Sequence, residues 1–128
     1  MAYSFSGYKN NKGEAIVLVC DGGGYFANLP KYLNEINHSP DGFNWGYCGS
    51  GPAQLAYALL RFFTEQELFG KEEIKEDKNL ARNIASTYYQ DFKVDVVSTL
   101  SDKWTLKGKD IEKWLVAKIM ERDNEAIS

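Results

Sequence analysis

The segment Asn37–Leu60, NHSPDGFNWGYCGSGPAQLAYALL, joins an unusual loop to an ordinary amphipathic helix. Its first half contains the only histidine of the chain, one of two cysteines and one of three tryptophans. From Pro52 onward, apolar residues recur at three- and four-residue steps, which predicts a helix. This concentration of polar, aromatic and glycine residues in front of a helix suggests that the loop is the functional site.

The start of this helix has two alternative caps. Pro52 suits the first helical position, because its missing N–H costs nothing there. With Gly51 as the N-cap, Gln54 falls where a side chain can reach back to the cap N–H, as in a capping box. With Ser50 as the cap, its hydroxyl accepts a free helix N–H.

The residues before the loop predict strands. YSFSGY (3–8) alternates aromatic and small residues, AIVLVC (15–20) is a β-branched run, and YFANL (25–29) is a third short candidate. NNKG (10–13) and DGGG (21–24) predict the turns between them. LPKYLNEI (29–36) fits a short helix and an irregular segment equally well.

The residues after the loop predict helices. Apolar stripes at helical spacing cover Pro52–Leu68, Asn79–Thr99 and Asp110–Arg122. A charged connector occupies 69–77, and we expect the tail 123–128 to fray. The sequence therefore predicts a single compact α+β domain whose folded part spans about residues 3–122. We expect a small antiparallel sheet of two to three N-terminal strands packed against about three helices.

Composition excludes several classes of protein. The chain has 128 residues and a net charge of −3, which does not favour a general nucleic-acid binder. No apolar run approaches the ~20 residues needed to cross a membrane. The polar N-terminus lacks the pattern of a signal peptide, so we expect a cytoplasmic protein with Cys20 and Cys48 as free thiols.

The glycines of the loop have two interpretations. A glycine-rich turn before a helix N-terminus can bind an anion through backbone N–H groups and the helix dipole. The spacing matches neither a P-loop nor a dinucleotide-binding fingerprint. The alternative is that the glycines permit tight backbone turns around Trp45 and Tyr47.

The side chains of the loop leave catalysis open as an alternative. His38 paired with Cys48 or with Ser50 would resemble a nucleophile and its base, although no known local motif surrounds them. No spacing of ligands predicts a metal site, and we expect no cofactor. Phe43, Trp45 and Tyr47 would share one face of an extended segment, where they either stack on a ligand or partner or pack inward.

The segment Asn37–Ala56 resembles the signature N-H-S-P-x-G-F-x-W-G-Y-G-G-S-G-P-A-Q-L-A of an uncharacterised domain family of bacterial and mobile-element or phage proteins. Cys48 stands where that signature has glycine. YQDFK (89–93) resembles its second motif, and WTLKGKDIEKWL (104–115) resembles its closing helix, with Lys107 at a position where Ser or Thr is common.

The resemblance spans about residues 3–118 and implies no activity. It implies that the loop, Gln54 and a helix face carrying Tyr89, Gln90, Phe92 and Lys93 belong together. A gene on a mobile element would fit a counter-defence or host-modulating role, which rests on this resemblance alone.

Our leading hypothesis is a small non-catalytic binding module for a protein partner or a small anionic, nucleotide-like ligand. The alternatives are a small hydrolase or transferase, and a purely structural loop with function on another surface. Ligand identity and oligomeric state stay open. The residues expected to bind are Asn37, His38, Ser39, Trp45, Tyr47, Ser50, Gly51, Gln54, Tyr89 and Lys93.

Overall fold

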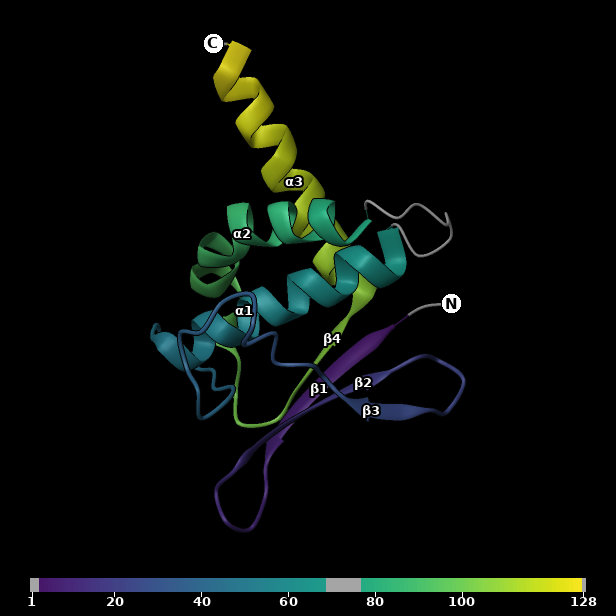
Figure 1. Ribbon diagram of the computed structural model, residues 1–128, viewed down its shortest axis with the longest axis vertical. Helices are drawn as coiled ribbons and strands as arrows, with labels where there is room; N and C mark the ends of the chain where they lie inside the picture. Colours follow the sequence, from purple (N-terminus) through teal and green to yellow (C-terminus); the bar gives the residue numbers. More distant parts are fainter. Residues whose placement is uncertain (1–2, 69–76, 128) are drawn as a thin grey trace.

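The computed structural model describes residues 3–68 and 77–127. Within these ranges the chain forms an α+β domain of four strands and three α-helices (Figure 1). A π-helical turn, Thr64–Leu68, extends the first helix, and a 3₁₀ turn, Val97–Thr99, follows the second. The strands and α-helices are β1 (Ser4–Lys9), β2 (Ala15–Cys20), β3 (Phe26–Asn28), α1 (Ser50–Phe63), α2 (Asp77–Asp95), β4 (Trp104–Lys107) and α3 (Gly108–Ile127).

The sheet is antiparallel with the order β3-β2-β1-β4, so it has four strands rather than two or three. The additional strand β4 was expected to begin the closing helix. It pairs instead with β1, Gly7 lying opposite Trp104. The Trp104 ring covers Gly7, where any side chain would collide with it. Only glycine at position 7 therefore leaves room for the ring of the neighbouring strand.

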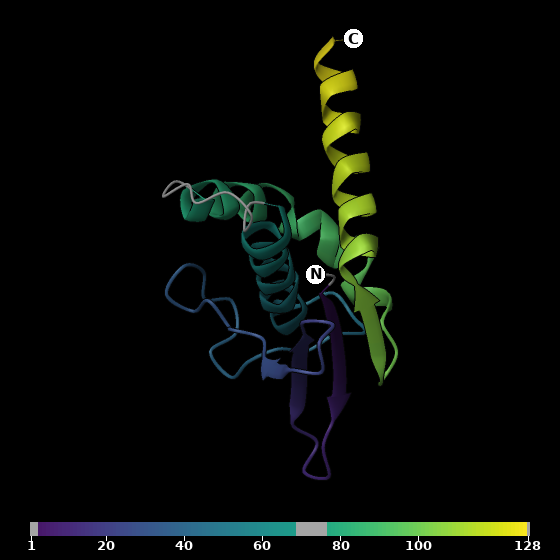
Figure 2. The same cartoon turned by 90° about the vertical axis from the view of Figure 1, so that its right-hand side faces the viewer.

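The core lies between the sheet and the helices, which stack on one side of it (Figures 1 and 2). The alternation along the strands turns Phe5, Val17 and Val19 inward. Helix α1 lies in the middle and is buried along almost its whole length. Its small residues, Ala53, Ala56 and Ala58, suit such an enclosed helix because they allow close approach by its neighbours.

The structure confirms the two later helices that the sequence predicts, but their bounds differ from the predicted ones. Helix α2 ends at Asp95, before the predicted Thr99. Helix α3 begins at Gly108 and continues to Ile127, so the expected frayed tail is helical through that residue. The far half of α3 projects away from the remainder of the domain (Figures 1 and 2). The charged connector at 69–77 lies outside the described residues except for Asp77, the first residue of α2.

Both predicted caps of α1 are wrong. The helix begins at Ser50, and its N-cap is Gly49, which has extended backbone and no side-chain cap. Gln54 closes no capping box because its side chain is engaged with a different part of the chain. The preceding LPKYLNEI segment is irregular, with Tyr32 in the left-handed region at φ 55°.

Candidate functional site

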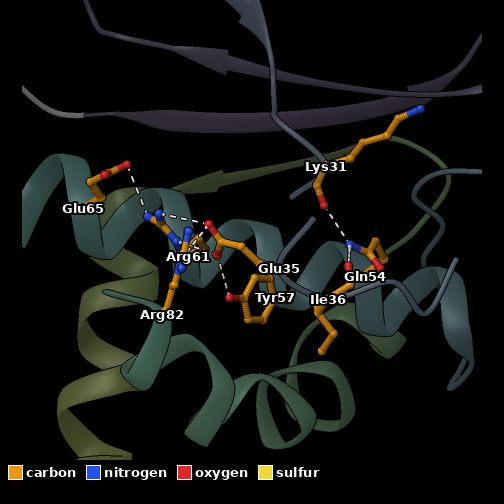
Figure 3. A network of polar contacts seen from close by, with 8 residues as sticks. All are labelled: Lys31, Glu35, Ile36, Gln54, Tyr57, Arg61, Glu65 and Arg82. Carbon is orange, nitrogen blue, oxygen red and sulfur yellow. Dashed lines mark hydrogen bonds and ion pairs between the residues drawn. The ribbon is translucent and has the colours of Figure 1, made fainter. Parts of the chain in front are cut away.

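Gln54 holds the loop onto α1. Its side chain is fully buried, and its amide donates to the carbonyls of Lys31 at 2.7 Å and Ile36 at 2.9 Å. Its side-chain oxygen accepts the His38 N–H at 2.9 Å. One helical residue thus forms hydrogen bonds with three backbone groups of an irregular segment. Figure 3 shows the two that the Gln54 amide donates, to Lys31 and Ile36. Gln54 positions the loop and presents no free polar group to a ligand.

Trp45 also belongs to the interior. It is 5% exposed, and its ring meets the edge of Trp104 with centroids 5.6 Å apart. The Lys9 ammonium lies 4.6 Å from the centre of the Trp45 ring and donates to Asn44 Oδ1 at 2.7 Å. This packing ties the loop to the sheet and supports the structural interpretation of this tryptophan.

Tyr47 is the aromatic side chain that the loop exposes. The sequence suggested that Phe43, Trp45 and Tyr47 share one face of an extended segment. Gly46 breaks that alternation because its φ is 83°, in the left-handed region that favours glycine. Phe43 is half-buried and Trp45 is buried, whereas Tyr47 is 49% exposed and lies against Gly49.

His38 pairs with Tyr89 across the surface between the loop and α2. The His38 Nε2 and Tyr89 Oη atoms lie 2.8 Å apart. This contact joins the loop to Tyr89 on α2, one of the residues that the family resemblance grouped with the loop. Among the described residues, no hydrogen bond links His38 to Cys48 or Ser50, as the catalytic alternative required. Cys20 and Cys48 are free cysteines.

The other residues of the predicted site are dispersed. Asn37 and Ser50 are exposed, Ser39 is half-buried, and Gly51 is buried against Asn44. A Cβ on Gly51 would lie 2.7 Å from the Asn44 Cβ, so glycine permits this contact. Lys93 is half-buried and forms no ion pair with the part of the chain that the structure describes. A pocket between Lys93 and the loop stays a prediction.

A buried charge network beside the loop was not predicted. Glu35, in the irregular segment, accepts from Tyr57 Oη at 2.8 Å and from Arg61 Nε at 2.8 Å (Figure 3). Its second carboxylate oxygen lies 3.2 Å from Arg61 Nη2 and 3.1 Å from Arg82 Nε. Arg61 also pairs with Glu65 at 3.2 Å. The network joins the irregular segment to both α1 and α2.

The electrostatics of this network favour its ionised form. Burial by itself raises the pKa of Glu35, but hydrogen bonds from Arg61 and Tyr57 and the charges of Arg61 and Arg82 outweigh it and lower that pKa. Burial and the hydrogen bond to Glu35 raise the pKa of Tyr57 to about 12. Glu35 therefore stays a carboxylate at neutral pH.

The sequence carried a signal for this network. Tyr57, Arg61 and Glu65 recur every four residues and so share one helix face. Arg61 interrupts an apolar run, Leu59 to Phe63, and a charge among core residues requires a partner. The position of Glu35 could not be found this way, because it depends on an irregular backbone.

A groove of about 490 Å³ lies where the loop passes the edge of β2. One wall consists of the loop residues 41–44, and the other consists of β2 residues 15–17 with Asn28 and Leu29. Two lysines, Lys9 and Lys31, and two acidic residues, Glu14 and Asp41, also line it. The predicted loop thus borders the groove, but through 41–44 rather than through the residues expected to bind.

Two charges in this groove are unpaired. The side chains of Lys31 and Asp41 form no hydrogen bond or ion pair with any residue that the structure describes. Lys9 donates to Asn44, and Glu14 accepts from Asn10 at 3.3 Å. In Figure 3 the Lys31 side chain extends away from Gln54 and the charge network. The groove therefore offers one free charge of each sign.

The described residues contain neither a cluster of metal ligands nor a membrane-spanning helix. No cluster of three or more His, Cys, Asp or Glu residues there could hold a metal ion. No helix in the same ranges is both long and apolar enough to cross a bilayer.

Fold and site together define a small α+β domain in which one buried glutamine holds an irregular loop beside a groove of mixed charge. The chain belongs to a family of unknown function (DUF6166), whose model matches residues 5–117. This confirms the expectation of an uncharacterised domain family. Neither a curated protein nor a solved structure matches the chain.

Proposed function

We propose that this protein is a non-catalytic binding module that takes a segment of a partner protein into the groove between the loop and β2. The observation that carries this proposal is the groove itself, about 490 Å³ in volume and bordered by the unpaired charges of Lys31 and Asp41. Grooves of this size with a few convergent polar groups are the usual form of a binding site.

A protein segment suits this groove better than a small anion does. A phosphate or dicarboxylate near Lys31 would also meet the carboxylates of Asp41 and Glu14, which repel it. A peptide can present an acidic and a basic side chain to the two free charges and fill the remaining volume with its backbone.

The test is a selection of displayed random peptides on the folded full-length chain. Binding of a selected peptide is then measured by fluorescence anisotropy to the unchanged protein and to Lys31→Glu. Charge reversal at the groove should weaken binding at least about tenfold, since one favourable ion pair becomes a repulsion. Lys113→Glu is the matched control, because Lys113 is exposed on α3, outside the groove.

Three outcomes contradict the proposal. Failure to select any peptide removes the protein-segment function, and equal weakening by Lys31→Glu and Lys113→Glu places binding elsewhere. A parallel thermal-shift panel of phosphates, nucleotides and dicarboxylates gives the third. Stabilisation by one of these compounds that Lys31→Glu removes would identify a small-anion site instead.

We also propose that the protein acts in the cytoplasm, where its two thiols stay reduced. The loop also resembles a sequence signature of bacterial and phage proteins. This resemblance supports the proposal that the protein is encoded on a mobile element and modulates the host. Expression of the protein in a bacterial host during phage challenge, with Lys31→Glu in parallel, tests that role. Equal host survival with either form would contradict a role that depends on the groove.

A further inference from the structure

The edge of β2 carries backbone groups that no strand of the described residues pairs. In the β1–β2 ladder, Asn10 N–H donates to Glu14 O, whereas Val17 O accepts the Leu29 N–H on the other side. Along an antiparallel strand, successive residues direct their backbone N–H and C=O groups to opposite neighbours. The odd-numbered residues of β2 therefore direct these backbone groups away from β1. The Ala15 N–H and C=O and the Val17 N–H therefore face the groove.

The path of the chain after Asn28 keeps this edge open. Strand β3 pairs with Leu18–Cys20 and stops at Asn28, and the same register would place Pro30 and Lys31 opposite Ile16 and Ala15. In this register residue 30 would face away from β2, so Pro30 removes no bond of the ladder, and the next pairing groups would be the N–H and C=O of Lys31. Gln54 instead draws the Lys31 carbonyl onto α1 at 2.7 Å. In Figure 1 the hairpin of β1 and β2 accordingly extends beyond β3.

We propose that the partner segment binds as an extended strand added to this free edge of β2, alongside Ala15–Val17. The proposal rests on the proposed function and names its mode of recognition. The added strand takes the place that β3 would occupy if it continued beyond Asn28 in the same register. Its backbone pairs with the Ala15 N–H and C=O and with the Val17 N–H, the usual source of affinity when a strand joins an open sheet edge.

The charges beside the edge define the chemistry of the segment. Lys31 and Asp41 both line the groove with unpaired side chains. An added strand therefore carries an acidic side chain toward Lys31 and a basic one toward Asp41. Side chains two residues apart on a strand share one face, so a spacing of two or four residues places both toward the groove wall.

The first test uses the selected peptides and leaves the protein unchanged. Each backbone N–H of one peptide is methylated in turn, and binding to the full chain is measured. The free edge offers one acceptor, the Ala15 C=O, so methylation should weaken binding about tenfold at the one peptide residue that donates to it and leave the two neighbouring positions unaffected. Binding that tolerates methylation everywhere would overturn strand addition while leaving the proposed function intact.

The second test removes a protein donor. Ala15→Pro deletes the N–H that faces the groove without removing a bond of the β1 ladder, and it should weaken peptide binding about tenfold. Its control is Ala15→Val, which restores the N–H with a good strand former and should bind as the unchanged protein does. Undiminished binding by Ala15→Pro would overturn the proposal.

The two proposals fail in distinguishable ways. Lys31→Glu reports whether the groove is used, and the methylation scan reports whether the occupant is a paired strand. A peptide that loses affinity with Lys31→Glu but has no N–H whose methylation weakens binding supports the groove and refutes the strand. If no peptide is selected at all, both proposals are refuted.

Discussion

At the residue scale, Gln54 has the most consequence for the loop. Gln54→Ala leaves two carbonyls and one N–H without partners in a buried site, and each such group costs about 1–3 kcal/mol. We expect the variant to lose about 3 kcal/mol or more of its free energy of unfolding in urea. Gln90→Ala, an exposed change on α2, should stay within about 0.5 kcal/mol of the unchanged protein. Equal stability of the two variants would show that Gln54 does not hold the loop.

The aromatic residues of the loop divide by burial. Trp45→Ala removes a ring that is 5% exposed and should cost about 3–5 kcal/mol of stability. Tyr47→Ala truncates a ring that is 49% exposed and should change stability by about 0.5 kcal/mol or less. Thermal or urea unfolding of both variants measures these changes. A Trp45→Ala variant as stable as the unchanged protein would contradict the structural role of Trp45 and favour a role in binding.

Sequence reasoning at this scale singled out the loop but left open which of its aromatic residues are buried. Burial of Trp45 and exposure of Tyr47 both follow from Gly46, whose positive φ turns the chain between them. Gln54 was selected from the family resemblance and from its place near a helix start. Its actual partners are backbone groups 16 to 23 residues earlier, which no local pattern reveals.

At the scale of elements, the Glu35 network joins the irregular segment to two helices. Glu35→Gln removes the charge that compensates buried Arg61, and at pH 7 this should cost about 3–5 kcal/mol. The folded-state pKa of Glu35 lies below its ordinary value of 4.5, so its carboxylate stabilises the fold above that pH. This stabilisation is lost as the pH falls through the folded-state pKa.

The unchanged protein and Glu35→Gln should therefore approach each other in stability as the pH falls below 4.5. Urea unfolding at pH 7 and at acidic pH measures this, with exposed Glu112→Gln as the control. A stability difference that grows on acidification would contradict the assigned direction of the pKa.

Elements with a strong local period were predictable, and those defined by distant partners were not. The strands β1 and β2 and the three helices followed from their apolar spacing. Strand β4 has four residues and is a strand because β1, about a hundred residues earlier, supplies its ladder. Its alternation was too short to separate from the helix that follows it.

At the scale of the whole molecule, the docking of α3 closes the domain. Leu115 and Val116 are adjacent on this helix, but Leu115 is 1% exposed and Val116 is 47% exposed. Leu115→Ala should cost about 2–5 kcal/mol in urea unfolding, and Val116→Ala about 0.5 kcal/mol or less. Similar costs for both would mean that α3 does not pack against the core as described.

The whole account depends on where a partner segment binds, and residue-resolved NMR of the full chain measures that most directly. A selected peptide is titrated in, and the backbone amide shifts are followed. The account predicts that the largest changes fall on the groove, at Ala15, Val17, Lys31 and Gly42. Changes confined to residues outside the groove lining, at His38, Tyr47 and Tyr89, would contradict it.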